Sequence, residues 1–279
     1  AVTKPGDKVI VQTPVYFPFF EVIEGLGRQM TINELAYDGQ HYTMDFEKLA
    51  AQIDNNTRAI MLCSPHNPVG RAWTRDELET LAALAQDHGL YIISDDIHAD
   101  LLLHGNIHYP LATLSEAMAA RTITAMAPSK TFNMAGLAAS LVVIPDPEIR
   151  KRYAHYLQSL HLGMGNIFGL AGLEAAYRHG HPWLDALLGY LEQNLAWMER
   201  YFIGHIPQVK LIRPEATYLA WLDFRELGLD DKGLQKFLAE KARVGLNNGA
   251  RFGQGGEGFM RMNFACPRAV LQQGVEQIA

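Results

Sequence analysis

Short apolar runs alternate with helical patterns along the first half of the chain. The strand-like runs are residues 9–12, 58–64, 90–94, 121–127 and 139–144. Runs such as LYIIS, RTITAMA and ASLVVI are nearly continuous, which is typical of strands covered on both faces of a parallel sheet. The strand–helix–strand order predicts an α/β layered domain with a mainly parallel sheet.

The helix expected after residue 74 carries clear boundary signals. Thr74 and Glu77 have the spacing of a capping box, in which a hydroxyl and a carboxylate satisfy free backbone donors of the first turn. Gly89 is placed to end the helix. Its apolar stripe consists of Leu78, Leu81, Ala82 and Ala85.

Beyond Pro147 the pattern becomes mainly helical and then mixed. Helices are expected over residues 183–202 and 231–242 and after Pro267, with strands at 209–212, 216–223 and 258–263. This mixture predicts a smaller α+β lobe. We therefore divide the chain into a large domain, residues 1–190, and a C-terminal small domain, residues 191–279.

Composition narrows the function classes. The 279 residues carry a formal charge of −6 with 19% charged residues, and without a basic stripe a small-molecule site is favoured over nucleic acid. No apolar run approaches the ~18 residues of a membrane span, so we expect a cytoplasmic protein that binds no membrane. Cys63 and Cys266 lie far apart in apolar stretches, which favours reduced thiols over a disulfide. The 11 histidines include no zinc-like spacing beside a cysteine pair, so we expect no metal.

Lys130 follows an apolar strand and stands between Ser129 and Thr131. The ends of strands in open α/β sheets are where ligands bind. A lysine held partly out of water there favours the neutral amine, which attacks an aldehyde. The alternative is a surface lysine on a loop.

Three further segments at strand ends carry candidate chemistry. Asp95, at the end of LYIIS, could keep a pyridinium nitrogen protonated, although Asp95 and Asp96 could also cap a helix or bind a metal. Asn67 lies in a rigid SPHNPVG turn and could donate to a ring oxygen, or serve only the turn. Arg261 lies in an apolar strand, where its planar guanidinium could bind a carboxylate ligand through two hydrogen bonds or form an internal salt bridge.

Six stretches in order give the chain a family resemblance. They are TPVYFPFF, SPHNPVGRAWTRDEL, ISDDIHADL, APSKTFNMAGL, ATYLAWLD and GFMRMNFACPR, spread over residues 13–268. Together they resemble fold-type-I pyridoxal-phosphate (PLP) enzymes, the aspartate aminotransferase superfamily. Within it they are similar to the MalY/PatB-type cystathionine β-lyase branch.

The resemblance implies a PLP cofactor held by residues of this chain. Lys130 would carry the cofactor and later move protons, and Asp95 would pair with the pyridine nitrogen. Tyr16 would stack on the ring, and Ser129 would help to hold the phosphate.

The resemblance also implies the substrate and the reaction. His98 and Asn67 would lie near the ring hydroxyl, and Arg261 would bind the α-carboxylate of an amino-acid substrate. The implied reaction is α,β-elimination from cystathionine or another cysteine S-conjugate, which gives a thiol, pyruvate and ammonia. An aminotransferase of class I/II is the alternative, and a non-catalytic regulatory or remnant protein is a third. Ala138 stands where many aminotransferases have a phosphate-binding arginine, which favours the lyase.

The relatives implied by the resemblance carry roughly a hundred further residues before the position of Ala1, including a helix start that binds the phosphate. They form homodimers, and we expect the same of the whole protein. The chain starts with Ala rather than Met, and we interpret it as lacking the N-terminal segment. We therefore expect weak or no lyase turnover from these 279 residues alone.

Overall fold

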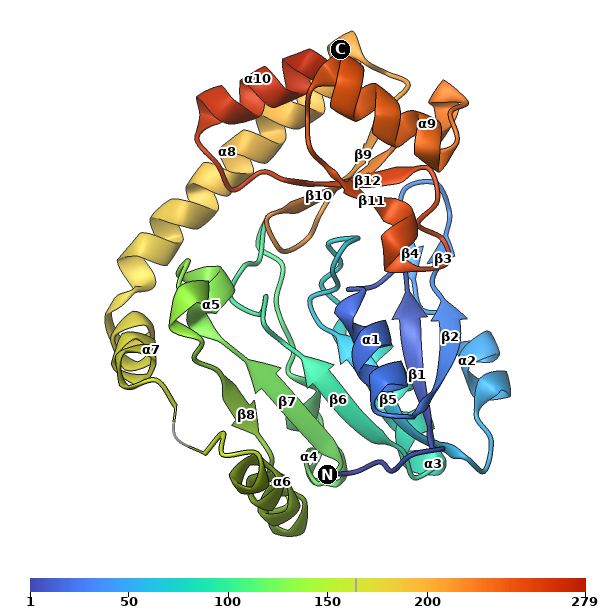
Figure 1. Cartoon of the computed structure of the whole chain (residues 1–279), viewed down its shortest axis with the longest axis vertical. Coiled ribbons are helices and arrows are strands. Elements are labelled where there is room, and N and C mark those ends of the chain that lie inside the picture. The colour runs from blue at the N-terminus through green and yellow to red at the C-terminus, as the bar shows by residue number, and fades with distance from the viewer. Residues whose placement is uncertain (164) are drawn as a thin grey trace.

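A six-stranded sheet forms the centre of the N-terminal part of the protein (Figure 1). The computed structural model describes residues 1–163 and 165–279. The strand order is β2-β1-β5-β6-β7-β8, and only β8 runs antiparallel to its neighbour. The strands are β1 (Lys8–Thr13), β2 (Gln29–Glu34), β5 (Thr57–Cys63), β6 (Tyr91–Asp95), β7 (Thr122–Met126) and β8 (Leu141–Val143). The predicted α/β class with a mainly parallel sheet is confirmed.

Helices cover both faces of this sheet. They are α1 (Pro18–Gly25), α2 (Phe46–Gln52) and α3 (Arg75–Asp87). On one face Leu81 of α3 packs in the same cluster as Ile92 of β6, and on the other Phe19 of α1 packs with Val11 of β1. Burying both faces explains why these strands have continuous apolar sequences.

The predicted boundaries of α3 are confirmed. Thr74 accepts from the backbone of Glu77, whose side chain bonds back to the backbone of Thr74. The helix ends at Asp87, and Gly89 follows with a φ of +65°. The predicted apolar stripe is buried.

The expectation for residues 139–144 is wrong in one respect. β8 pairs antiparallel with β7 and is an edge strand, not a strand covered on both faces. Leu141 is 40% exposed and Val143 is 49% exposed: alternate residues of a strand share one face of the sheet, and this face of β8 is open. β2 was not predicted, although Met30 and Ile32 alternate with polar residues in QMTINE, which is a short signal of a half-buried strand.

The C-terminal part contains a four-stranded antiparallel sheet in the order β11-β12-β10-β9. Its strands are β9 (Lys210–Ile212), β10 (Leu219–Asp223), β11 (Asn247–Asn248) and β12 (Phe259–Asn263). The helices of this half are α6 (Pro147–Ser159), α7 (Ile167–His179), α8 (His181–His205), α9 (Asp231–Lys236) and α10 (Arg268–Ile278). The helix expected over 231–242 changes to a wider π-helix at Phe237–Ala242. The division at residue 190 falls within α8 and remains a prediction.

The two sheets meet at the edge that carries the candidate chemistry. In Figure 1 the parallel strands point with their carboxyl ends toward the C-terminal sheet. A short hairpin, β3 (Ala36–Tyr37) and β4 (Tyr42–Thr43), lies beside this region. Among the helices of the described residues, none has the length and apolarity needed to span a bilayer.

Candidate active site

A pocket of about 300 Å³ lies at the carboxyl edge of the parallel sheet, against the C-terminal sheet. It is lined by residues from both halves of the chain. Six of the seven residues singled out in the sequence line it: Tyr16, Asn67, Asp95, His98, Lys130 and Arg261. Ser129 precedes Lys130 in the short helix α5 (Pro128–Thr131) and is not among the lining residues.

Asp95 ends β6 and turns its carboxylate into this pocket. Burial raises its pKa to about 6, while the Ile97 N–H, which donates to Oδ1 at 3.2 Å, opposes the rise. The charge of Asp96 raises the pKa further and that of Lys130 lowers it. A carboxylate that is poorly solvated by water is stabilised by a cationic partner, and a protonated ring nitrogen would be one.

Lys130 reaches the pocket from α5, which follows β7 directly. The neighbouring Thr131 is fully buried and donates to Asp100 Oδ2 at 2.8 Å, so α5 is anchored to the segment after β6. Lys130 itself is half-buried, and no carboxylate of residues 1–163 or 165–279 forms a salt bridge with it. The amine is therefore available to a ligand in the pocket.

His98 presents an unsatisfied polar atom. The side chain is buried, and its Nδ1 has no hydrogen-bond partner in the described part of the chain. Burial lowers its pKa to about 3, and the charges of Lys130 and Arg261 act in the same direction. The imidazole is thus neutral at physiological pH, with its ring edge against Tyr218 at 5.8 Å between centroids. Since Nδ1 is enclosed as well as unpartnered, it is the position of His98 in the pocket lining that places the imidazole beside a ligand.

Asn67 and Arg261 are joined directly across the pocket. Arg261 Nη1 donates to Asn67 Oδ1 at 2.8 Å, and Nη2 donates to Asn247 Oδ1 at 2.9 Å. Because the asparagine oxygen is used in this way, its Nδ2 remains free to donate to a ligand. The Nε of Arg261 is buried without a partner among the described residues, and no carboxylate there forms a salt bridge with the guanidinium. An internal salt bridge, the alternative for this arginine, is not found.

Several lining residues were not singled out in the sequence. They are Phe17, Cys63, Ile97, Tyr218, Leu219, Asn247 and Asn263. Three of them, Phe17, Ile97 and Asn263, stand within two positions of selected residues, so these neighbours could have identified them. Asn247 lies in the short strand β11, and no pattern in the sequence marks it.

A buried ion network holds the Asn67 loop in place. Arg71 is 5% exposed and donates to Glu215 Oε2 and Glu77 Oε2, both at 2.8 Å, and to the carbonyl of Tyr42. Glu215 and Ala216 also donate their N–H groups to the carbonyl of Gly70. The loop is therefore fixed to both α3 and the segment before β10.

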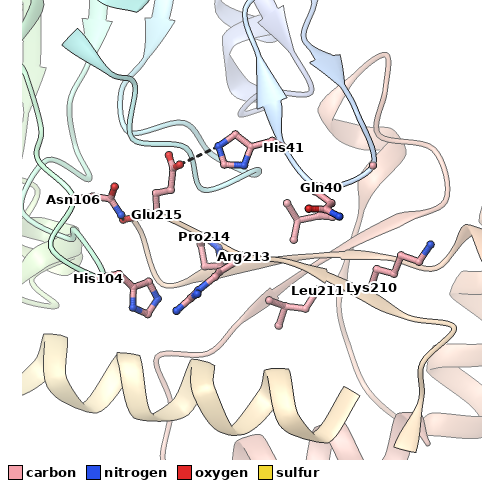
Figure 2. Close-up of a pocket in the computed structure, with 11 residues that line it drawn as sticks. Gln40, His41, His104, Asn106, Lys210, Leu211, Arg213, Pro214 and Glu215 are labelled. Carbon is pink, nitrogen blue, oxygen red and sulfur yellow. Dashed lines mark hydrogen bonds and ion pairs between the residues drawn. The ribbon is translucent and has the colours of Figure 1, made fainter. Parts of the chain in front are cut away.

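A second cleft, of about 530 Å³, lies beside Glu215 (Figure 2). Its charged side chains already have partners. His41 contacts Glu215 at 3.2 Å, Arg213 contacts Glu199 at 3.2 Å, and Lys210 contacts Glu226. Within the described residues, each charged side chain of this cleft has an ionic partner, so no free charge there selects a ligand.

The pocket fits PLP by the chemistry of its lining. It offers a carboxylate suited to a ring N–H, a free amine, a free imidazole nitrogen and a half-buried Tyr16 ring. Asp95 and Asp96 do not support the metal interpretation, since no group of three or more His, Cys, Asp or Glu in the described chain could hold an ion.

Comparisons with known proteins agree with this geometry. The model of the family "aminotransferase class I and II" matches residues 1–278. Cystathionine β-lyase PatB of Bacillus subtilis is 45% identical over 279 residues, which is 100% of this chain and 72% of that protein. The structure resembles PLP-containing cystalysin of Treponema denticola with a TM-score of 0.97 at 39% identity, covering 99% of this chain and 70% of that one. It also resembles a PLP-bound C–S lyase of Staphylococcus hominis with a TM-score of 0.92 at 31% identity, covering 99% and 71%.

Proposed function

The chain belongs to the aminotransferase class I and II family of fold-type-I PLP enzymes, and from this premise we propose that it is a carbon–sulfur β-lyase. Its substrate would be cystathionine or another cysteine S-conjugate, cleaved to a thiol, pyruvate and ammonia. The observation that carries the proposal is the meeting of Lys130 and Asp95 in one pocket. The names of the relatives, cystathionine β-lyase and C–S lyase, support elimination over amino transfer.

Bound PLP supplies an electron sink for the negative charge that develops at the substrate Cα. Asp95 is proposed to hold the ring N–H, which keeps the ring cationic. Its raised pKa indicates a carboxylate that such a cation would stabilise. Tyr16 would cover one ring face, and the His98 imidazole and Asn67 Nδ2 would lie near the ring hydroxyl.

Lys130 is proposed as the group that moves the proton. Its amine would take the proton from the substrate Cα, and the electron pair of the broken β-C–S bond would leave with sulfur as a thiolate. The proton held on Nζ would be returned to the leaving sulfur or to solvent. The aminoacrylate released then takes up water and gives pyruvate and ammonia.

Arg261 is proposed to position the substrate through its α-carboxylate. The guanidinium is partly buried on β12 and retains an unpartnered Nε. Its bond to Asn67 couples the carboxylate site to the proposed ring-hydroxyl site. A bidentate contact at this position would fix Cα near Lys130.

Product identity tests this function, even where turnover is slow. The 279-residue protein is incubated with PLP and cystathionine, and pyruvate, ammonia and thiol are quantified against a Lys130→Ala control. In keeping with the weak turnover expected of these 279 residues, we expect small amounts of the three products in equal proportion, and none from the variant. Transfer of the amino group to an added keto acid without pyruvate or thiol would identify an aminotransferase and refute the lyase.

A further inference from the structure

Asp96 forms a buried cluster directly behind Asp95. Successive residues of an extended chain point to opposite sides, so Asp96 points away from the pocket that Asp95 lines. Its side chain is 1% exposed and contacts the Ser94 hydroxyl through Oδ1. Its Oδ2 lies 2.8 Å from Nε2 of His108, whose side chain is 9% exposed.

The buried Asp96 carboxylate of this cluster requires a positively charged partner. A carboxylate enclosed by protein needs a positive partner, because burial of an unpaired charge is unfavourable. Ser94 can donate only a neutral hydrogen bond. Within the described residues, His108 is the basic side chain that contacts Asp96, and a proton on its second nitrogen would make the pair neutral.

We propose that His108 is a positioning residue for the active site: by pairing as a cation with Asp96 it offsets most of that buried charge, so that Asp95 can carry its own charge toward a cationic ring nitrogen. The consequence for catalysis depends on the proposed function, whereas the charge cancellation itself does not. Without His108, the negative charge of one of the two adjacent buried carboxylates would disfavour ionisation of the other.

Other charged groups near Asp95 do not replace this pairing. Lys130 faces Asp95 from α5, on the pocket side. Cys63 neighbours Asp95 on β5, and burial raises the pKa of its thiol well above the ordinary value, so it carries no charge. His98 is neutral, because burial lowers its pKa to about 3.

A carboxyl titration in the cofactor-free protein tests the proposal. Aspartate side chains are labelled with ¹³C in the 279-residue protein, and the Asp95 signal is assigned by its loss in Asp95→Asn. His108→Gln keeps a polar side chain but removes the cation, so we expect the pKa of Asp95 to rise by about one unit. Asp96→Asn removes the competing charge together with the need for the cation, so we expect only a small fall in the pKa of Asp95, from the part of the Asp96 charge that His108 does not offset.

The double variant His108→Gln/Asp96→Asn distinguishes charge cancellation from a structural role. We expect it to return the pKa of Asp95 close to that of the unaltered protein, because neither charge remains. A pKa that is unchanged in His108→Gln, with a fall of about one unit in Asp96→Asn, would show that His108 is neutral and overturn the proposal. If one single variant does not fold, the other and the double variant decide. Since no cofactor or substrate is present, failure here is separate from failure of the lyase function.

Discussion

Replacing Asp95 by Asn should make the protein more stable above neutral pH. The folded protein holds the pKa of Asp95 at about 6, against an ordinary value of 3.8, mainly because burial disfavours the carboxylate. Between these two pH values the unfolded chain has already lost the proton while the folded chain keeps it, so folding stability falls as pH rises through this window. Above about pH 7 the loss amounts to about 3 kcal/mol, since each pKa unit corresponds to about 1.4 kcal/mol.

Asparagine cannot ionise and keeps the same shape, so the variant escapes this loss. Urea unfolding of the cofactor-free protein and of Asp95→Asn at about pH 4.5 and about pH 8 measures the effect. The stability advantage of the variant should grow by about 2 kcal/mol between these conditions, because part of the window lies below pH 4.5. Asp87→Asn, at an exposed aspartate ending α3, controls for the general effect of removing one negative charge. An advantage that does not grow with pH would refute the reasoning.

Three further changes test other parts of the account. Arg261→Lys should raise the KM for cystathionine by about tenfold or more with a smaller effect on kcat, because the ammonium cannot make the bidentate contact; equal loss in both constants would contradict a positioning role. Thr74→Ala should cost about 1 kcal/mol in urea unfolding, because the capping box of α3 is lost; no change would show that the cap is not needed. Arg71→Met should cost about 3–5 kcal/mol, because Glu215 is left without its buried partner, whereas Arg75→Met, at an exposed pair, should cost nothing measurable in the same assay.

Local signals in the sequence were sufficient to predict the central strands of the parallel sheet and the boundaries of α3. The apolar runs at β5, β6 and β7 arise because both faces of the sheet are covered, and Thr74 with Glu77 defines a helix start in four residues. β8 was misjudged because an edge strand can have the same composition as a central one. Its pairing with β7 decides that it runs antiparallel, and the packing over its two faces, which no local pattern shows, decides its exposure.

The candidate site was predictable where its residues follow strands. Asp95 and Lys130 each lie directly beyond an apolar run, so the common edge of a parallel sheet brings them together. Asn247 and the Arg71–Glu215 pair could not be predicted in this way. Arg71 and Glu215 are more than a hundred positions apart along the chain, so no local pattern links them. Asn247 reaches the pocket only through the fold of the C-terminal sheet.

The central claim is that Lys130 carries PLP in the pocket that Asp95 completes. The most direct measurement is reduction of the PLP-treated 279-residue protein with borohydride, followed by peptide mass spectrometry. We predict a single modified lysine, in the peptide containing Lys130, together with loss of the visible absorbance band in Lys130→Ala. Modification spread over surface lysines, with Lys130 unmodified, would contradict the account.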